Sequence, residues 1–167
     1  MHTAGNHIDA KPNLFLDDAK NNRFIIMPKL ILIRGLPGSG KTTFAKKLLQ
    51  QLPNTVHFEA DMFFMSKHGK YVFQANRLPL AHQWCMRKTK QALTRQKNVV
   101  VSNTFTRQSE MQFYLDLAHD LGCELSIYVT TGTWPSVHQV PTDMIEKMRA
   151  RWEPYALETF VSDVDSQ

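Results

Sequence analysis

The feature that most constrains this chain is a glycine-rich turn that joins an apolar run to an amphipathic segment. The turn reads Gly35-Leu36-Pro37-Gly38-Ser39-Gly40-Lys41-Thr42, after residues 30–33 (Leu-Ile-Leu-Ile) and before residues 43–49. Glycines let such a loop curl until consecutive N–H groups point inward, and the following helix adds unpaired N–H groups and a positive dipole end. We therefore predict a phosphate-binding P-loop between a buried strand and a helix.

Two side chains at the end of the loop have the expected nucleotide chemistry. Lys41 is placed to reach the β- and γ-phosphates, and the hydroxyl of Thr42 is placed to ligate Mg²⁺. The predicted nucleotide contacts are Gly35, Leu36, Pro37, Gly38, Ser39, Gly40, Lys41, Thr42 and Thr43. A glycine-rich turn that binds nothing would leave Lys41 without an evident role.

Length and composition predict one globular domain with anionic ligands. The chain has 167 residues, 43% of them hydrophobic, which is enough for one full core. The formal net charge of +5 suits nucleotides or nucleic acid. No apolar stretch approaches membrane-spanning length, and the two cysteines lack metal-site spacing, so we expect a cytoplasmic protein without a membrane partner.

Apolar and amphipathic segments alternate along the chain. We expect strands at residues 30–33, 55–60, 99–101 and 124–129, and helices at residues 43–49, 78–96, 106–121 and 141–152. Such alternation predicts an α/β fold with a parallel sheet and with ligands at its carboxyl edge. The domain should span residues 27–155, after a loosely structured extension over 1–26 and before a C-terminal tail over 156–167.

Polar side chains follow two of the expected strands. Asp61 follows the second strand, where a carboxylate could take the proton of a substrate hydroxyl. It could instead cap the turn that follows it. Ser102 and Asn103 end the strand expected beside the P-loop strand, where many P-loop proteins have a Mg²⁺-binding acid. No acid is present there, so these two side chains should either bind a metal-bound water or shape a turn. Asn103 is also a candidate contact for the substrate.

Several motifs together resemble one known family. They are Leu32–Thr43, Glu59-Ala60-Asp61, Tyr71-x-Phe73, Ala81-His82-x-Trp84-Cys85, Val99–Thr106, Glu110-Met111, Val140-Pro141 and Met148–Glu153. On these motifs, residues 27–153 are similar to the polynucleotide-kinase-like P-loop family, which includes phage polynucleotide 5′-kinase and the kinase-like domain of Nedd-four-binding proteins.

The family resemblance implies a fold and several site residues. The fold would be an AAA-type P-loop NTPase, a three-layer sandwich with a central parallel sheet and an adenylate-kinase-like core. ATP with Mg²⁺ would be the phosphate donor. Asp61 lies where the family has the general base that deprotonates a 5′-hydroxyl, and His82 lies at a position characteristic of the Nedd-four-binding relatives.

The chain departs from the family pattern in the lid, the segment that closes over the nucleotide. Residues 130–140 contain no arginine, whereas the family carries arginines there in a longer segment. Such an arginine stabilises transition-state charge and changes the rate by about a thousandfold or more. We therefore expect a shortened lid, with Arg149 as the first choice for the substitute positive charge and with Arg151, Arg107 or a partner as the alternatives. Arg149 and Arg151 could instead be solvated charges on a helix face.

Three further groups have both a functional and a structural interpretation. His82 could contact substrate or pack in the core. A set of basic residues could guide a nucleic-acid backbone or simply face solvent, and a set of aromatic residues could stack on a base or pack in the core. The basic set is Lys67, Lys70, Arg77, Arg87, Lys88 and Lys90, and the aromatic set is Phe58, Phe63, Phe64, Tyr71 and Phe73.

These observations favour an ATP-dependent phosphotransferase acting on a hydroxyl of a nucleic acid, a nucleoside or a related small acceptor. Lys41 and Thr42 would handle the donor, and Asp61 would activate the acceptor. Two alternatives stay open. One is a nucleotide-binding module or slow ATPase with a degenerate lid, and the other is a zeta-toxin-like sugar-nucleotide kinase. The sequence identifies neither the acceptor nor the oligomeric state.

Overall fold

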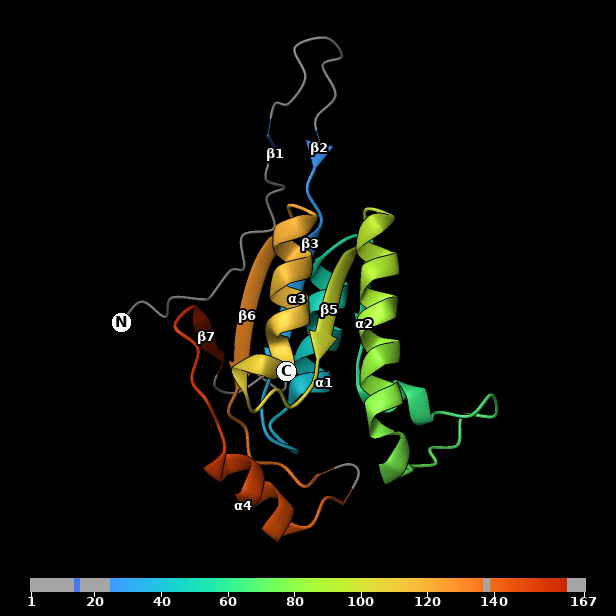
Figure 1. Ribbon diagram of the computed structural model, residues 1–167, viewed down its shortest axis with the longest axis vertical. Helices are drawn as coiled ribbons and strands as arrows, with labels where there is room; N and C mark the ends of the chain where they lie inside the picture. Colours follow the sequence, from blue (N-terminus) through green and yellow to red (C-terminus); the bar gives the residue numbers. More distant parts are fainter. Residues whose placement is uncertain (1–13, 16–24, 137–138, 162–167) are drawn as a thin grey trace.

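The main body of the protein is a five-stranded parallel sheet with helices on both faces (Figure 1). The computed structural model describes residues 14–15, 25–136 and 139–161. Across the sheet the strands run in the order β4 (Thr55–Phe58), β5 (Asn98–Ser102), β3 (Lys29–Arg34), β6 (Glu124–Thr130) and β7 (Glu158–Val161). Every neighbouring pair is parallel, so the carboxyl ends of the strands share one edge.

The helices enclose the sheet in three layers. Helix α1 (Lys41–Gln51) covers one face, and α2 (Leu78–Thr94) and α3 (Gln108–Asp120) cover the other (Figure 1). The remaining helices are η1 (Ala60–Phe64), η2 (Ala75–Arg77) and α4 (Thr142–Ala150), the last of which lies beyond the carboxyl edge. Within the described ranges, no helix combines the length and the apolar character needed to cross a membrane.

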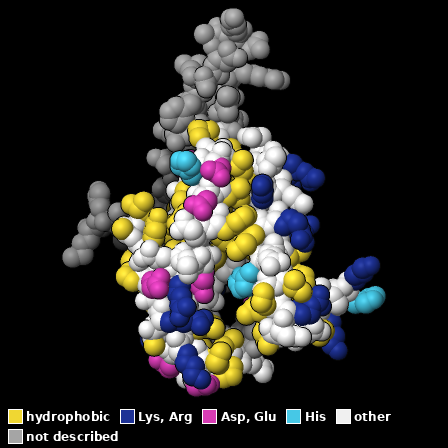
Figure 2. Space-filling view, viewed as in Figure 1, with side chains coloured by type: hydrophobic (Ala, Val, Ile, Leu, Met, Phe, Trp, Pro, Cys, Tyr) yellow, Lys and Arg dark blue, Asp and Glu magenta, His cyan; other side chains and the backbone are white. Residues whose placement is uncertain are grey.

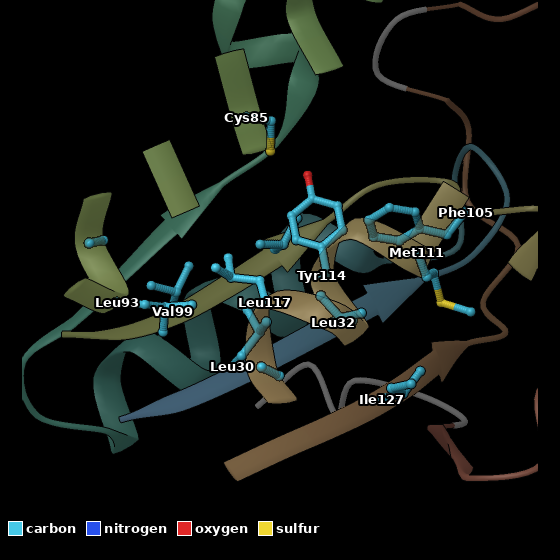
Figure 3. Close-up of a cluster of buried hydrophobic side chains, with 13 residues drawn as sticks. Leu30, Leu32, Cys85, Leu93, Val99, Phe105, Met111, Tyr114, Leu117 and Ile127 are labelled. Carbon is cyan, nitrogen blue, oxygen red and sulfur yellow. The ribbon is translucent and has the colours of Figure 1, made fainter. Parts of the chain in front are cut away.

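The alternation of side chains along β3 divides the core between the two faces of the sheet. Leu30 and Leu32 pack on the side of α2 and α3, whereas Ile31 and Ile33 pack on the side of α1. Figure 3 shows the cluster on the side of α2 and α3, to which both helices and the strands β3, β5 and β6 contribute side chains. A central strand buried on both faces explains the uninterrupted apolar run that precedes the glycine-rich turn.

The three-layer α/β architecture expected from the sequence is confirmed. The expected strands and helices between residues 30 and 152 are all present, within a few residues of their predicted bounds. Of the extension expected over residues 1–26, the structure describes β1 (Leu14–Phe15) and β2 (Ile25–Ile26), which pair antiparallel. The other residues of that extension lie outside the described ranges.

The C-terminal segment differs from the prediction. Residues 156–167 are expected to form a tail, but Glu158–Val161 form β7 and pair in parallel with β6. The strand is short and its Phe160 side chain is 64% exposed, so no apolar run reveals it in the sequence. It is held instead by a distant residue, because Nη1 of Arg34 donates to Oε2 of Glu158 at 2.7 Å. Residues 162–167 lie outside the described part of the chain.

Candidate nucleotide and acceptor site

The phosphate loop forms the connection from β3 to α1, at the carboxyl edge of the sheet. Gly38 (φ 77°) and Gly40 (φ 92°) adopt the left-handed conformation, which side-chain-bearing residues rarely adopt. Helix α1 begins directly afterwards at Lys41, and its first turn supplies N–H groups without helical partners. The loop therefore has the backbone form expected for a phosphate cradle.

Lys41 is bonded to the backbone of the loop itself. Its Nζ donates to the carbonyl oxygens of Gly35 at 2.9 Å and Leu36 at 3.0 Å. Burial lowers the pKa of Lys41 to about 8, although the nearby carboxylates of Glu59 and Asp61 favour the charged form. The ammonium group is thus held at the loop by neutral carbonyls, and an ionised phosphate would be a stronger partner for it.

Glu59, immediately after β4, places a carboxylate beside Thr42. Its Oε2 accepts hydrogen bonds from Oγ1 of Thr42 at 3.1 Å and from Oγ of Ser102 at 3.0 Å. Nε2 of His57 lies 2.7 Å from the same Ser102 oxygen, and burial lowers the pKa of His57. Because Ser102 gives its single proton to Glu59, His57 donates to Ser102, and this chain of hydrogen bonds orients the carboxylate.

The end of β5 carries no carboxylate, but the end of the neighbouring strand β4 does. These strands are neighbours in the sheet, so Glu59 and Ser102 meet although they are 43 positions apart. The sequence motif alone assigns Glu59 no separate role. The signal that could have identified it is an acid directly after a strand, provided that this strand is known to lie beside the strand of Ser102.

Asp61 lies within η1, at the same edge. The hydroxyl of Tyr71 donates to Oδ1 of Asp61 at 3.2 Å. The N-cap of η1 is Glu59, so the interpretation of Asp61 as the cap of this turn is wrong. The negative charges of Asp61 and Glu59 both act to raise the pKa of Lys41. Both carboxylates therefore lie near the phosphate loop.

Asn103 is 7% exposed and binds other parts of the fold. Its Oδ1 accepts a hydrogen bond from the N–H of Ala60 at 2.9 Å, and its Nδ2 lies 3.8 Å from Sγ of Cys85. These contacts fix the start of η1 and hence the position of Asp61. A direct contact of Asn103 with substrate stays a prediction.

His82 lies on α2, partly buried, on the side that approaches this edge. Burial lowers the pKa of His82, and the carboxylates of Glu110 and Asp61 act in the opposite direction. The histidine thus lies within electrostatic reach of Asp61. Its predicted contact with substrate is compatible with this position and stays a prediction.

The arginines expected to replace the missing lid arginines have other partners. Nε of Arg149 lies 3.6 Å from Oε1 of Glu146 on the same helix, and the Arg149 side chain is 61% exposed. Nε of Arg151 donates to Oγ1 of Thr106 at 3.0 Å. Neither of these contacts involves the phosphate loop, so a catalytic role for Arg149 stays a prediction.

Basic side chains gather along α2 and the loop before it, at the right of Figure 2. Arg87, Lys90 and Arg95 line a shallow depression on the second half of α2. The turn η1 packs instead on the first half of α2, near Ala81. The depression is therefore displaced along α2 from Asp61, and a contact of these residues with nucleic acid stays a prediction.

The aromatic residues around Asp61 divide into packed and exposed side chains. Phe64 is 5% exposed and packs with Ala60. Phe73 is 51% exposed and stacks on Tyr71, with ring centroids 6.5 Å apart and an interplanar angle of 14°. Tyr71 and Phe73 therefore form a flat, partly exposed pair next to the Asp61 carboxylate.

Fold and site together define a nucleotide-binding, kinase-like P-loop protein. The evidence is the strand order, the phosphate loop after the central strand β3 with its lysine, and the carboxylates that follow β4, two strands away at the same edge. The family described as an AAA domain matches residues 30–139, and the chain belongs to this family.

Known proteins with similar sequence or structure agree with this class. NEDD4-binding protein 2 of Homo sapiens is 34% identical over 90 residues, which are 53% of this chain and 5% of the human protein. A chain of the Pnkp1/Rnl/Hen1 RNA repair complex has a TM-score of 0.60 at 22% identity and matches 80% of this chain and 46% of its own length. Kti12 of Chaetomium thermophilum, in complex with ADP-AlF3, has a TM-score of 0.62 at 14% identity, over 82% and 91% of the two chains.

The coverage of these relatives is uneven. This chain spans a small part of the human relative and less than half of the RNA repair protein, but most of Kti12. The similarities confirm the expected resemblance to the polynucleotide-kinase-like P-loop family and the P-loop fold.

Proposed function

We propose that this chain is an ATP-dependent phosphotransferase that moves the γ-phosphate of ATP to a hydroxyl of a nucleic acid, a nucleoside or a related small acceptor. The observation that carries the proposal is the convergence of Lys41, Glu59 and Asp61 at one edge of the sheet, beside the phosphate loop. Phosphoryl transfer on P-loops depends on positioning and on charge stabilisation. A cation for the phosphates and a carboxylate for the acceptor are therefore the groups that the reaction needs.

Donor binding would use the phosphate loop and Lys41. The N–H groups of the loop and of the first turn of α1 bind phosphate oxygens. Lys41 exchanges the carbonyl oxygens of Gly35 and Leu36 for oxygens of the β- and γ-phosphates. The negative charge of the phosphates then favours the charged form of Lys41, against the effect of burial.

Thr42 and Glu59 fit the magnesium ion that accompanies ATP. Their oxygens are hard donors 3.1 Å apart, and Mg²⁺ is usually held by one or two protein groups together with waters and phosphates. In the ranges that the structure describes, no cluster of three or more His, Cys, Asp or Glu side chains could hold a metal alone, so the phosphates would complete the coordination. When bound, the ion neutralises charge on the β- and γ-phosphate oxygens.

Acceptor activation would fall to Asp61. Its carboxylate takes the proton of the acceptor hydroxyl while that oxygen forms the new bond to the γ-phosphorus and ADP leaves with the electron pair of the broken P–O bond. The hydrogen bond from Tyr71 orients the carboxylate. The stacked Tyr71 and Phe73 rings favour an acceptor with a base, since every base has a flat face that can stack on them.

The experiment that tests the proposal measures phosphate transfer and ATP binding together. ATP labelled at the γ-phosphate is incubated with the protein and with 5′-hydroxyl oligonucleotides, nucleosides or sugar-nucleotides, and labelled product is separated. We expect labelled product with the oligonucleotides or with the nucleosides. We also expect ATP with Mg²⁺ to raise the melting temperature, and Lys41→Ala to abolish most of that shift. An unchanged melting temperature of the folded wild type at millimolar ATP would rule out the nucleotide site.

A second candidate function is a nucleotide-binding module or slow ATPase. It is favoured by the arginine-free segment at residues 130–140 and by the partners of Arg149 and Arg151 away from the phosphate loop. The same assay separates the two functions. ADP and free phosphate without labelled acceptor, at a rate that no acceptor class increases, would favour the ATPase. A labelled sugar-nucleotide as the only product would favour the third hypothesis, a zeta-toxin-like kinase.

A further inference from the structure

The loop after β6 lies against the phosphate loop and carries Trp134. The N–H of Gly132 donates to the carbonyl oxygen of Ser39 at 3.2 Å, and the N–H of Trp134 donates to that of Gly38 at 2.9 Å. Both bonds use carbonyl oxygens of the phosphate loop. They therefore hold Trp134 beside the loop without competing with a phosphate for its N–H groups.

Two glycines make room for the indole ring. A Cβ at Gly40 would lie 2.9 Å from Cζ3 of Trp134, and a Cβ at Gly132 would overlap the same ring. Gly40 also needs to be glycine because its φ is 92°, but Gly132 has no such φ, so the ring alone accounts for the glycine there. Although the ring packs on these glycines, Trp134 remains 48% exposed. The protein thus holds the partly exposed ring of Trp134 next to Gly40, the last residue before Lys41.

We propose that Trp134 is the platform on which the base of the bound nucleotide stacks. This inference rests on the proposed function, because it requires that the phosphates bind in the loop. A nucleotide held there by its phosphates has its base one ribose away, and the ring of Trp134 lies beside Gly40 at the start of α1. Stacking on an aromatic face depends little on the identity of the base, so the site accepts purine nucleoside triphosphates with little preference between ATP and GTP.

The test compares ligands with and without a base. Dissociation constants for ATP, GTP and inorganic tripolyphosphate, each with Mg²⁺, are measured by calorimetry for the wild type, Trp134→Ala and Trp134→Phe. Loss of a stacking platform weakens binding on the order of tenfold. We expect that loss for ATP and GTP in Trp134→Ala, a change of less than about twofold for tripolyphosphate, and retention of most of the affinity in Trp134→Phe. Trp84→Phe, on α2, is the matched control and should bind all three ligands as the wild type does.

Tryptophan emission gives an independent readout. The difference in emission between wild type and Trp134→Phe isolates the signal of Trp134. We expect ATP to change this signal and tripolyphosphate to leave it unchanged at saturation. Equal losses of affinity for ATP and tripolyphosphate in Trp134→Ala would refute the stacking role of Trp134, as would equal emission changes with the two ligands. Either result would leave the proposed phosphate site unaffected. If neither ligand bound the wild type, the nucleotide site itself would be refuted, and the platform with it.

Discussion

Arg34 and Glu158 form a buried ion pair across 124 positions of sequence, with Nη1 donating to Oε2 at 2.7 Å. Their side chains are 0% and 4% exposed. Arg34 also donates to the carbonyl oxygens of Phe105 and Glu153, and its guanidinium lies 4.2 Å from the centroid of the Trp152 ring. The residue just before the phosphate loop thus anchors β7 to the centre of the sheet.

Glu158→Ala should strongly destabilise the protein, because it leaves the Arg34 charge buried without its carboxylate partner. Removal of one partner of a buried pair typically costs about 3–5 kcal/mol of the free energy of unfolding. Urea denaturation measures this loss. Asp143→Ala is the control, since its ion pair with Lys147 is exposed and should change stability by less than about 0.5 kcal/mol. Similar stabilities for the two variants would contradict the anchoring role.

ATP binding should take up protons near pH 8 and weaken as the pH rises further. Burial lowers the pKa of Lys41 to about 8 in the free protein, whereas bound phosphates favour the charged ammonium. At a pH equal to the pKa, about half of the molecules lack this proton, so uptake of up to about half a proton per ATP is expected there. Calorimetry at pH 8 in buffers of different ionisation enthalpy measures it. Lys46→Met, on the same helix, should leave the uptake unchanged, and absence of uptake between pH 7 and 9 would contradict the prediction.

Glu59→Gln should remove most of the gain in ATP affinity that Mg²⁺ provides. The amide keeps the size of the side chain but loses the charge that faces Thr42. Residues that support a metal site typically contribute about 10- to 100-fold to metal affinity. ATP titrations with Mg²⁺ and with EDTA give two dissociation constants for each variant, and their ratio measures the gain in affinity that Mg²⁺ provides. Glu124→Gln serves as the control, because Glu124 is the first residue of β6 and lies at the end of that strand away from the phosphate loop. An unaltered ratio in Glu59→Gln would exclude Glu59 from the metal site.

Asp61→Asn should keep ATP affinity near the wild-type value and lower phosphate transfer by on the order of a hundredfold or more. The amide cannot accept the acceptor proton, although it can still accept the hydrogen bond from Tyr71. Tyr71→Phe is the companion variant, since it keeps the carboxylate and removes that hydrogen bond, and we expect a smaller loss. Transfer at the wild-type rate by Asp61→Asn would mean that another group acts as the base.

Gly132→Ala should displace the Trp134 ring, because the added Cβ would overlap it. We expect weaker ATP binding and altered tryptophan emission. In a Trp134→Ala background the same substitution should have almost no further effect on affinity, which a double-mutant cycle measures. Additive effects of the two substitutions would show that Gly132 acts independently of the ring.

The fold was predictable where the sequence pattern is local. The run Leu30–Ile33 is buried on both faces, so it is apolar throughout, and the glycines of the next turn mark the start of α1 directly. Strand β7 was not predictable, because its exposed Phe160 and its dependence on Arg34 leave no local pattern.

The candidate site was predictable to a similar extent. Lys41, Thr42 and Asp61 follow from motifs and from strand ends, and the structure brings all three to one edge. The contact between Glu59 and Ser102 depends on the order of the strands across the sheet, and the position of Trp134 depends on backbone hydrogen bonds of a loop. Neither has a signal in local sequence.

The carboxylate of Glu59 at the end of β4 has a consequence for comparing such chains. Along the sequence, Ser102 and Asn103 leave the end of β5 without an acid. In space, the carboxylate of Glu59 lies one strand away, at a strand spacing of about 4.8 Å, and accepts hydrogen bonds from both Ser102 and Thr42. The acids of such a site are therefore better identified along the whole edge of the sheet than at the end of a single strand.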